Sequence, residues 1–264
     1  MKMTKAPVYY ALAQAQFNPV AAMAKYVDEI QDILRREGYT LFESQEITQL
    51  QFAGFAGQVP TKPELMQVTN WIISKSDRTA GFILSSSSLA FHTTHYETRN
   101  EFLPELVQGL QAVHKVVSLE HIARLGLRYL DAVIPGEGET VSQYLAGGLQ
   151  GVSFGAKQRY SMSESVFETE TGPLVKSGTL VARIYCATAL LGYPPDLIPH
   201  GLQPMSRFQI NDVASHAVMD ADHFVEGTMP IDFEQIKQQM ASLHAGIKQS
   251  FEATITPHAE EVWR

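Results

Sequence analysis

Cysteine is almost absent from this sequence. Cys186 is the single cysteine in 264 residues, so no disulfide bond can form within the chain and a disulfide-stapled fold is excluded. Long apolar runs are missing as well, because no stretch reaches the roughly 20 residues that a membrane-spanning helix needs. The basic N-terminus is not followed by the apolar region of a secretion signal. We therefore predict a cytoplasmic protein with no membrane contact.

Charged residues are scarce, and the balance between them is acidic. They make up 18% of the chain, with 28 acidic against 20 basic side chains and a net charge of −8. This balance disfavours a general nucleic-acid clamp, although a local basic patch stays open. Hydrophobic residues make up 45% of the chain, too many for a disordered protein. A chain of this mass is expected to bury about 73% of its extended surface, which allows a large core.

Hydrophobic residues follow two different periods along the chain, which predict strands and helices. Residues 8–17 alternate as in a strand, and Asn18-Pro19 is a typical helix start. In the first half the predicted strands are 8–17, 39–55, 67–74 and 79–94, and the predicted helices are 19–38 and 99–116. In the second half the predicted strands are 124–134, 158–170, 174–190 and 208–224, and the predicted helices are 140–149 and 232–252.

This order of elements predicts an α+β fold with antiparallel sheets and long helices. Residues 1–118 and 119–264 form two similar halves, each running strand, helix, three strands, helix. The repeated order suggests an internal duplication, although the halves do not align residue by residue. Because no linker rich in proline, glycine or serine separates the halves, we expect them to pack as one unit.

Two stretches of sequence carry a family resemblance. Residues 124–131 read Arg-Leu-Gly-Leu-Arg-Tyr-Leu-Asp and resemble the central R-x-G-L-R-Y-x-N motif of a sporadically distributed, uncharacterised family of bacterial proteins of about this length. The segment from His244 to Thr256, with the pattern H-x-x-I-x-x-x-F-E-x-x-I-T, is similar to the C-terminal signature of that family. The resemblance implies a bacterial protein in a mobile, defence-related or toxin–antitoxin setting. It assigns no catalytic residue, and Asp131 stands where the motif has asparagine.

Two arginines and two aspartates form the pattern most suggestive of a binding site. Arg124 and Arg128 share one face of a predicted strand, and two guanidinium groups on one face can hold a phosphate or a carboxylate. Asp220 and Asp222 share a face of a later strand. The alternative interpretation is structural, because these two carboxylates can pair with the two arginines on a neighbouring strand.

His216 lies on the same predicted face as Asp220 and Asp222, so these three residues are the best candidate for acid–base chemistry or metal binding. The sequence supplies no recognisable further ligand, and we predict neither a metal nor a cofactor. His92 and His95 are three residues apart on a strand and point to opposite faces, which argues against a shared zinc ion. The loop 135–140 lacks a phosphate-binding motif, and the serine run 85–88 lacks the G-x-S-x-G of a nucleophile elbow.

Apolar loops are the remaining feature of interest. Those around Phe55 and over residues 191–199, together with the tail that carries Trp263, either pack onto the body of the protein or form an interface. We predict a non-enzymatic binding or regulatory protein that acts through protein–protein contacts. A second hypothesis is an enzyme or receptor for a small anion or nucleotide, with the five candidate residues lining a pocket between the halves. A third is nucleic-acid binding through a local basic patch.

Overall fold

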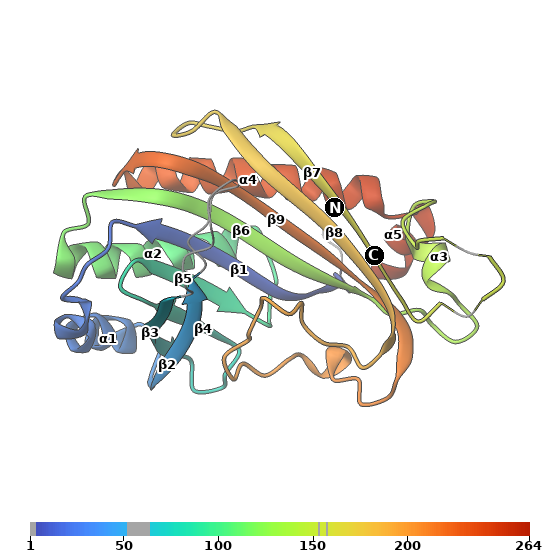
Figure 1. The fold of residues 1–264 in the computed structure, drawn as a ribbon, viewed down its shortest axis with the longest axis horizontal. Coiled ribbons are helices and arrows are strands. Elements are labelled where there is room, and N and C mark those ends of the chain that lie inside the picture. The colour runs from blue at the N-terminus through green and yellow to red at the C-terminus, as the bar shows by residue number, and fades with distance from the viewer. Residues whose placement is uncertain (1–3, 52–63, 153, 157) are drawn as a thin grey trace.

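The computed structural model describes residues 4–51, 64–152, 154–156 and 158–264. Within this part of the chain, nine strands form one antiparallel sheet in the order β2-β3-β4-β5-β1-β6-β9-β8-β7 (Figure 1). The α+β class predicted from the sequence is therefore confirmed. The strands are β1 (Val8–Phe17), β2 (Leu41–Gln51), β3 (Glu64–Ser74), β4 (Ala80–Leu84), β5 (Ser88–Thr93), β6 (His121–Val133), β7 (Tyr160–Glu170), β8 (Ser177–Ala189) and β9 (Ala214–Pro230).

Helices cover one face of this sheet. In Figure 1, α1, α2 and α4 lie behind the strands, and α3 and α5 lie together at the end of the molecule. No helix in the described part of the chain is both long and apolar enough to cross a membrane. The helices are α1 (Val27–Arg36), α2 (Arg99–Val117), α3 (Val141–Tyr144), α4 (Phe233–Thr254) and α5 (Pro257–Trp263).

Helix α4 shows how local sequence positions an element on the sheet. The side chain of Asp232 accepts hydrogen bonds from the backbone N–H groups of Glu234 and Gln235, which fixes the start of the helix. A buried apolar stripe then faces the sheet, formed by Ile236, Met240, Leu243 and Ile247. These side chains join the main core between sheet and helices, which contains residues of both halves.

The opposite face is covered by a long connection rather than by helices. Residues 190–213, here called the crossover segment, join β8 to β9 and run in front of the sheet (Figure 1). Leu197 and Phe208 of this segment are buried on Tyr9, Tyr10 and other apolar residues of the sheet in a second core. The segment also reaches the first half of the chain, where the Gln203 N–H donates to the carbonyl of Arg78 at 2.8 Å.

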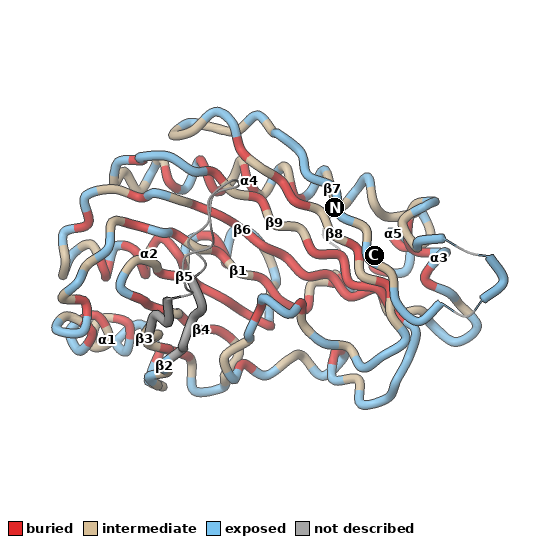
Figure 2. The backbone as a smooth tube through the Cα atoms, viewed as in Figure 1, coloured by how far each residue is buried: buried red, intermediate tan, exposed pale blue. Residues whose placement is uncertain are grey.

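The two halves share one sheet. β1 pairs with β5 of its own half on one side and with β6 of the other half on the other side. Burial is continuous across this junction (Figure 2). The two halves are therefore joined within one sheet. The proposed boundary near residue 118 falls between α2 and β6, and its origin in a duplication stays a prediction.

The first half contains one more strand than the sequence predicts. The single strand expected over 79–94 is in fact the hairpin of β4 and β5, with a turn at residues 85–87. Serine side chains stabilise this turn, because Ser85 Oγ and Ser88 Oγ lie 2.8 Å apart and the Ser87 N–H donates to Ser85 Oγ. The serine run is thus a turn, and the predicted order of strand, helix, three strands, helix is wrong for this half.

Several other boundaries differ from the prediction; for example, the helix predicted over 140–149 is the short α3, which ends at Tyr144. Asn18 does not cap a helix; its Oδ1 accepts from the N–H of Glu120 at 3.2 Å, and α1 begins only at Val27 after a single 3-10 turn. β9 begins at Ala214 because residues 206–208 form a 3-10 turn of the crossover segment. The predicted strand over 39–55 is described as far as Gln51, and the expected apolar loop at Phe55 lies outside the described residues.

The C-terminal tail folds back as helix α5, which the sequence does not predict. Thr256 caps it by accepting a hydrogen bond from the Ala259 N–H. Trp263 is buried, with its ring centroid 5.8 Å from that of Tyr144 and 6.0 Å from that of Phe251. Packing onto the body is therefore the correct alternative for the Trp263 tail.

Candidate functional site

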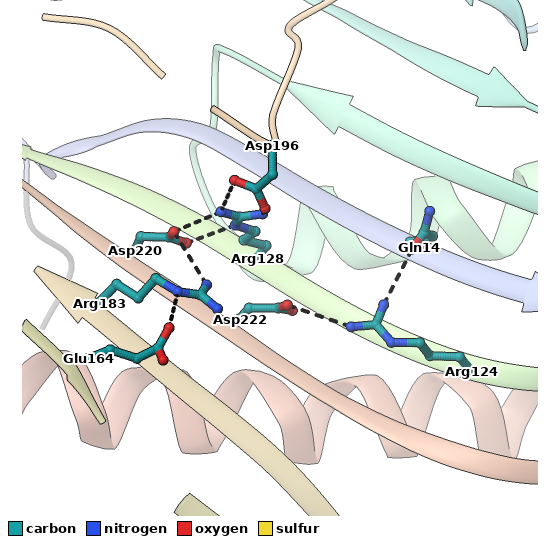
Figure 3. A network of polar contacts seen from close by, with 8 residues as sticks. All are labelled: Gln14, Arg124, Arg128, Glu164, Arg183, Asp196, Asp220 and Asp222. Carbon is teal, nitrogen blue, oxygen red and sulfur yellow. Dashed lines mark hydrogen bonds and ion pairs between the residues drawn. The ribbon is translucent and has the colours of Figure 1, made fainter. Parts of the chain in front are cut away.

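The predicted arginines and aspartates project from the sheet face that carries the crossover segment. In the register of β6 with β9, Arg128 lies opposite Asp222, and in the register of β8 with β9, Arg183 lies opposite Asp220. Residues directly opposite each other share a face of the sheet. The pairing of strands therefore brings together side chains that are far apart in sequence (Figure 3).

Arg128 is held by two carboxylates in bidentate geometry. Its Nε and Nη2 donate to Asp220 at 2.8 and 2.7 Å, and its Nη1 and Nη2 donate to Asp196 at 2.6 and 3.1 Å. Asp220 also faces Arg183 at 3.7 Å, and Arg183 donates to Glu164 at 2.6 Å. These five residues are called the Arg128 cluster (Figure 3).

Burial and pairing act against each other in the Arg128 cluster. The side chain of Asp220 is fully buried, and that of Arg128 is nearly so. Burial alone lowers the pKa of Arg128, but hydrogen bonds to Asp220 and Asp196 overcome this effect and raise it. The hydrogen bond from Arg128 in turn lowers the pKa of Asp196. The cluster is thus a network of arginines and carboxylates in which Arg128 and Asp220 are buried and Asp196 and Glu164 lie at the surface.

Arg124 belongs to a separate set of contacts. Its guanidinium lies 4.1 Å from the ring centroid of Phe224 and donates to Gln14 Oε1 at 3.3 Å. Asp222 and Glu226 lie 3.5 and 3.8 Å from its nitrogens, and burial raises the pKa of Asp222. Arg124 and Arg128 therefore do not converge on a shared ligand.

The charges on this face do not favour an anion. Three guanidinium groups, those of Arg124, Arg128 and Arg183, meet five carboxylates, which belong to Glu164, Asp196, Asp220, Asp222 and Glu226. Each arginine is already paired, so a phosphate or carboxylate ligand would have to displace an internal acid. The structural alternative for these residues, pairing between neighbouring strands, is what the geometry shows.

His216 stands apart from these ion pairs. Its Nδ1 lies 3.1 Å from the carbonyl of Ala214, and its side chain lines a cavity of about 210 Å³. This cavity is called the aromatic groove. Its other walls are formed mainly by Tyr160, Tyr185, Leu190, Tyr193 and Pro194. No group of three histidine, cysteine or acidic residues within the described chain is placed to hold a metal ion.

The remaining candidates have structural surroundings. His92 is buried, and its Nδ1 lies 3.0 Å from the hydroxyl of Tyr10; burial lowers the pKa of His92 to about 3, so its ring is neutral. His95 contacts Thr94 instead. Cys186 is buried, and burial raises the pKa of its thiol, which opposes a role as a nucleophile. The loop 135–140 leads into α3, which starts with a capping box at Thr140.

Sequence reasoning missed three members of the Arg128 cluster: Glu164, Arg183 and Asp196. Arg183 and Glu164 lie opposite each other on β8 and β7, and only the register reveals them. Asp196 comes from the crossover segment, whose path no local pattern predicts. The nearest sequence signal for Asp196 is that it directly follows Pro194-Pro195, because two prolines restrict the backbone and so help to fix the position of the next side chain.

The edge strand β7 is the second surface with functional potential. It pairs with β8 and has no neighbour on its other side in the described part of the chain. Four large apolar side chains on it are exposed: Tyr160 at 60%, Met162 at 51%, Val166 at 61% and Phe167 at 48%. Val166 and Phe167 point to opposite faces of the sheet because side chains alternate along a strand. Tyr160 also lines the aromatic groove, so the groove adjoins the strand edge.

Comparisons with known proteins add no relative. No protein-family model matches the chain, and neither the curated proteins nor the solved structures compared include a similar one. The resemblance of residues 124–131 and 244–256 to a bacterial family therefore stays a prediction. Any argument about function rests on the two surfaces described above.

Proposed function

We propose that this protein is a non-enzymatic binding or regulatory protein and that strand β7 contacts its protein partner. The observation that carries the proposal is an unpaired strand edge of 11 residues with exposed apolar side chains on both faces. Natural sheet proteins protect such edges unless they are used, because the edge readily pairs with another strand. An extended segment of the partner would add to β7 and extend the sheet.

The side chains of β7 indicate the chemistry of this partner. Tyr160 and Met162 make one end of the strand apolar, whereas Glu168 and Glu170 make the other end acidic. An antiparallel partner segment would therefore carry basic residues near its own N-terminal end and apolar residues near its C-terminal end. The aromatic groove beside Tyr160 would accept one of those apolar side chains.

Charge disfavours a second copy of this chain as the occupant. In a two-fold antiparallel pairing of β7 with itself over its whole length, Glu168 and Glu170 of one copy would face Met162 and Tyr160 of the other. The acidic end of each strand would then meet an apolar end and gain no basic partner. A segment with basic residues at that end complements β7 better than a second copy does.

The proposed setting is cytoplasmic and bacterial, in a defence-related or toxin–antitoxin context. This part of the proposal depends on the family resemblance of residues 124–131 and 244–256. An anion receptor is less favoured, because the guanidinium groups of Arg124 and Arg128 are engaged by carboxylates.

The test is stoichiometric co-purification from native cells with three versions of the protein. The variant carrying Val166→Lys and Phe167→Lys replaces exposed apolar side chains on both faces of β7. The matched control, Val213→Lys, makes the same change at a residue that is 67% exposed on the crossover segment. We expect wild type and Val213→Lys to retain a protein companion and the β7 variant to lose it. No companion with any version, or equal retention by all three, would contradict the proposal.

A further inference from the structure

A second cavity lies on the helix-covered face of the sheet. It has a volume of about 130 Å³ and is bounded by β6, α4 and the N-terminal residues 6–8. Its polar and aromatic walls come from Tyr96, Tyr129, Asp131, His244, Lys248 and Phe251. None of these residues is among the candidate site residues predicted from the sequence, and the Arg128 cluster projects from the other face.

Asp131 carries a buried carboxyl group. The residue is 4% exposed and lines the cavity, and its pKa is raised by burial, with no contribution from a hydrogen bond or a charge of the described residues. Beside it, the Tyr129 hydroxyl and His244 Nδ1 are buried without a hydrogen-bond partner among the described residues. Most buried polar groups in folded proteins are satisfied, so these two unsatisfied atoms beside the carboxyl group of Asp131 point to a missing ligand.

The lysine that lines the cavity does not neutralise Asp131. Lys248 stands on α4, and its Nζ lies 3.2 Å from Glu252 Oε1, one turn further along the helix. Both side chains of this pair are more than half exposed. The charge of an ionised Asp131 is therefore available to a cation that enters the cavity.

Aromatic rings surround the carboxyl group. The ring centroids of Tyr96 and Tyr129 are 5.1 Å apart in an edge-on arrangement, and those of Tyr129 and His244 are 5.8 Å apart. Burial lowers the pKa of His244 to about 4, so this ring is neutral and adds no repulsion. A carboxylate among aromatic rings is the environment that attracts organic ammonium ions.

We propose that this cavity binds a small alkylammonium ion through the carboxylate of Asp131 and the rings of Tyr96 and Tyr129. The cavity volume of about 130 Å³ suits a ligand with a few heavy atoms beyond the charged nitrogen. A metal ion fits poorly, because a single carboxylate offers too few hard ligands. An anion would be repelled by Asp131 once this carboxyl group is ionised. This proposal is independent of the contact proposed at β7.

The experiment titrates the purified protein with methylammonium and with tetramethylammonium chloride. The control ligands are tert-butanol, a neutral molecule of similar shape, and sodium chloride at equal ionic strength. Binding is followed by NMR shifts of the methyl groups of Val8 and Ile247, which line the cavity. The solution is held near pH 8.5, where an aspartate is ionised and alkylammonium ions keep their charge.

Two variants test whether binding depends on the charge of Asp131. Asp131→Asn keeps the shape of the side chain but removes its charge, and we expect it to weaken alkylammonium binding by at least about tenfold. Asp212→Asn makes the same change on the exposed crossover segment and should bind like wild type. Equal responses to tert-butanol, equal affinity in Asp131→Asn, or no saturable shift would overturn the proposal. A crystal soaked with methylammonium that holds only water in the cavity would do the same.

Discussion

Among individual residues, the Arg128 cluster illustrates how the chain keeps charge inside its fold. Asp220 is fully buried and would be strongly disfavoured as an isolated ion. The guanidinium group of Arg128 compensates for this cost with two short hydrogen bonds to Asp220. The guanidinium group of Arg183 adds a longer ion pair at 3.7 Å. Such a network stabilises the fold only while all partners are present, because each member depends on the charge of the next.

The first prediction concerns Asp220. Replacing it with alanine leaves the buried Arg128 with only the loop residue Asp196 as a partner, and we expect a loss of about 3–5 kcal/mol in the free energy of unfolding. The double variant Arg128→Met with Asp220→Leu removes both charges and should lose clearly less. Urea denaturation of the three proteins measures these differences. A double variant as unstable as Asp220→Ala would contradict the view that the uncompensated charge is the cause.

The second prediction concerns pH and Asp131. Burial raises the pKa of this carboxyl group to about 7 in the folded protein, whereas an unfolded aspartate titrates near 3.9. Between about pH 4 and 7 the folded state holds a proton that the unfolded state releases, so stability falls as pH rises through this window. The loss is complete above about pH 7, and the two pKa values limit it to about 4 kcal/mol.

The measurement compares urea midpoints of wild type and Asp131→Asn across this pH range. Other groups facing Asp131 come from the loop before α2 and from β6 and α4: Tyr96, Tyr129, His244 and Lys248. The pKa values of the two tyrosines are raised by burial and that of His244 is lowered to about 4, so they change little between pH 5 and 8. Wild type should lose stability relative to Asp131→Asn over that interval. Parallel profiles would show that Asp131 is not buried as described.

At the scale of helices and strands, hydrophobic periodicity predicts where an element lies and which of its side chains share a face. The sequence correctly predicts β1 at 8–17, because side chains alternate over most of this segment, although Tyr9, Tyr10 and Ala11 are all buried where the register with β6 shifts. The same alternation correctly predicts that Arg124 and Arg128 share a face, and the pairing with Asp220 and Asp222 is one of the alternatives that the sequence leaves open. Most of the elements follow from such patterns, but the hairpin of β4 and β5 and helix α5 do not.

Tertiary contacts decide the features that the sequence does not predict. Asn18 resembles a helix cap but binds the backbone at the start of β6, which lies about a hundred residues away. Asp196 reaches Arg128 only because the crossover segment folds over the sheet. Helix α5 has seven residues, too few to be stable alone, and it exists because its apolar side packs onto Tyr144 and Phe251.

The third prediction tests this account of α5. Trp263→Ala removes a large buried ring and should lower the free energy of unfolding by about 3–5 kcal/mol. Val262→Ala changes the neighbouring residue of the same helix, which is exposed, and should cost less than about 0.5 kcal/mol. Thermal or urea unfolding distinguishes the two. A small effect at Trp263 would mean that the tail is not docked in solution.

For the whole molecule, the shared sheet makes the two halves depend on each other. β1 and β6 pair over most of their length, and the main core contains side chains from both halves. The crossover segment adds contacts between β8–β9 and the turn at Arg78. Neither half has a complete core of its own within the described chain.

The fourth prediction is that the protein unfolds in a single transition. The two tryptophans report on different halves, since Trp71 lies on β3 and Trp263 on α5. In the single-tryptophan variants Trp71→Phe and Trp263→Phe, fluorescence and far-UV circular dichroism should give coincident urea midpoints. Midpoints that separate within either variant would show that the halves unfold independently.

The central claim is that β7 is the contact with a protein partner, and hydrogen exchange of its backbone amides tests this most directly. Every second N–H of an edge strand points away from its neighbour, so part of β7 should exchange quickly in the isolated protein. With the co-purified companion bound, we predict slower exchange across residues 160–170 and little change in the Asp131 cavity. Unchanged exchange in β7, with protection at another surface, would contradict the claim.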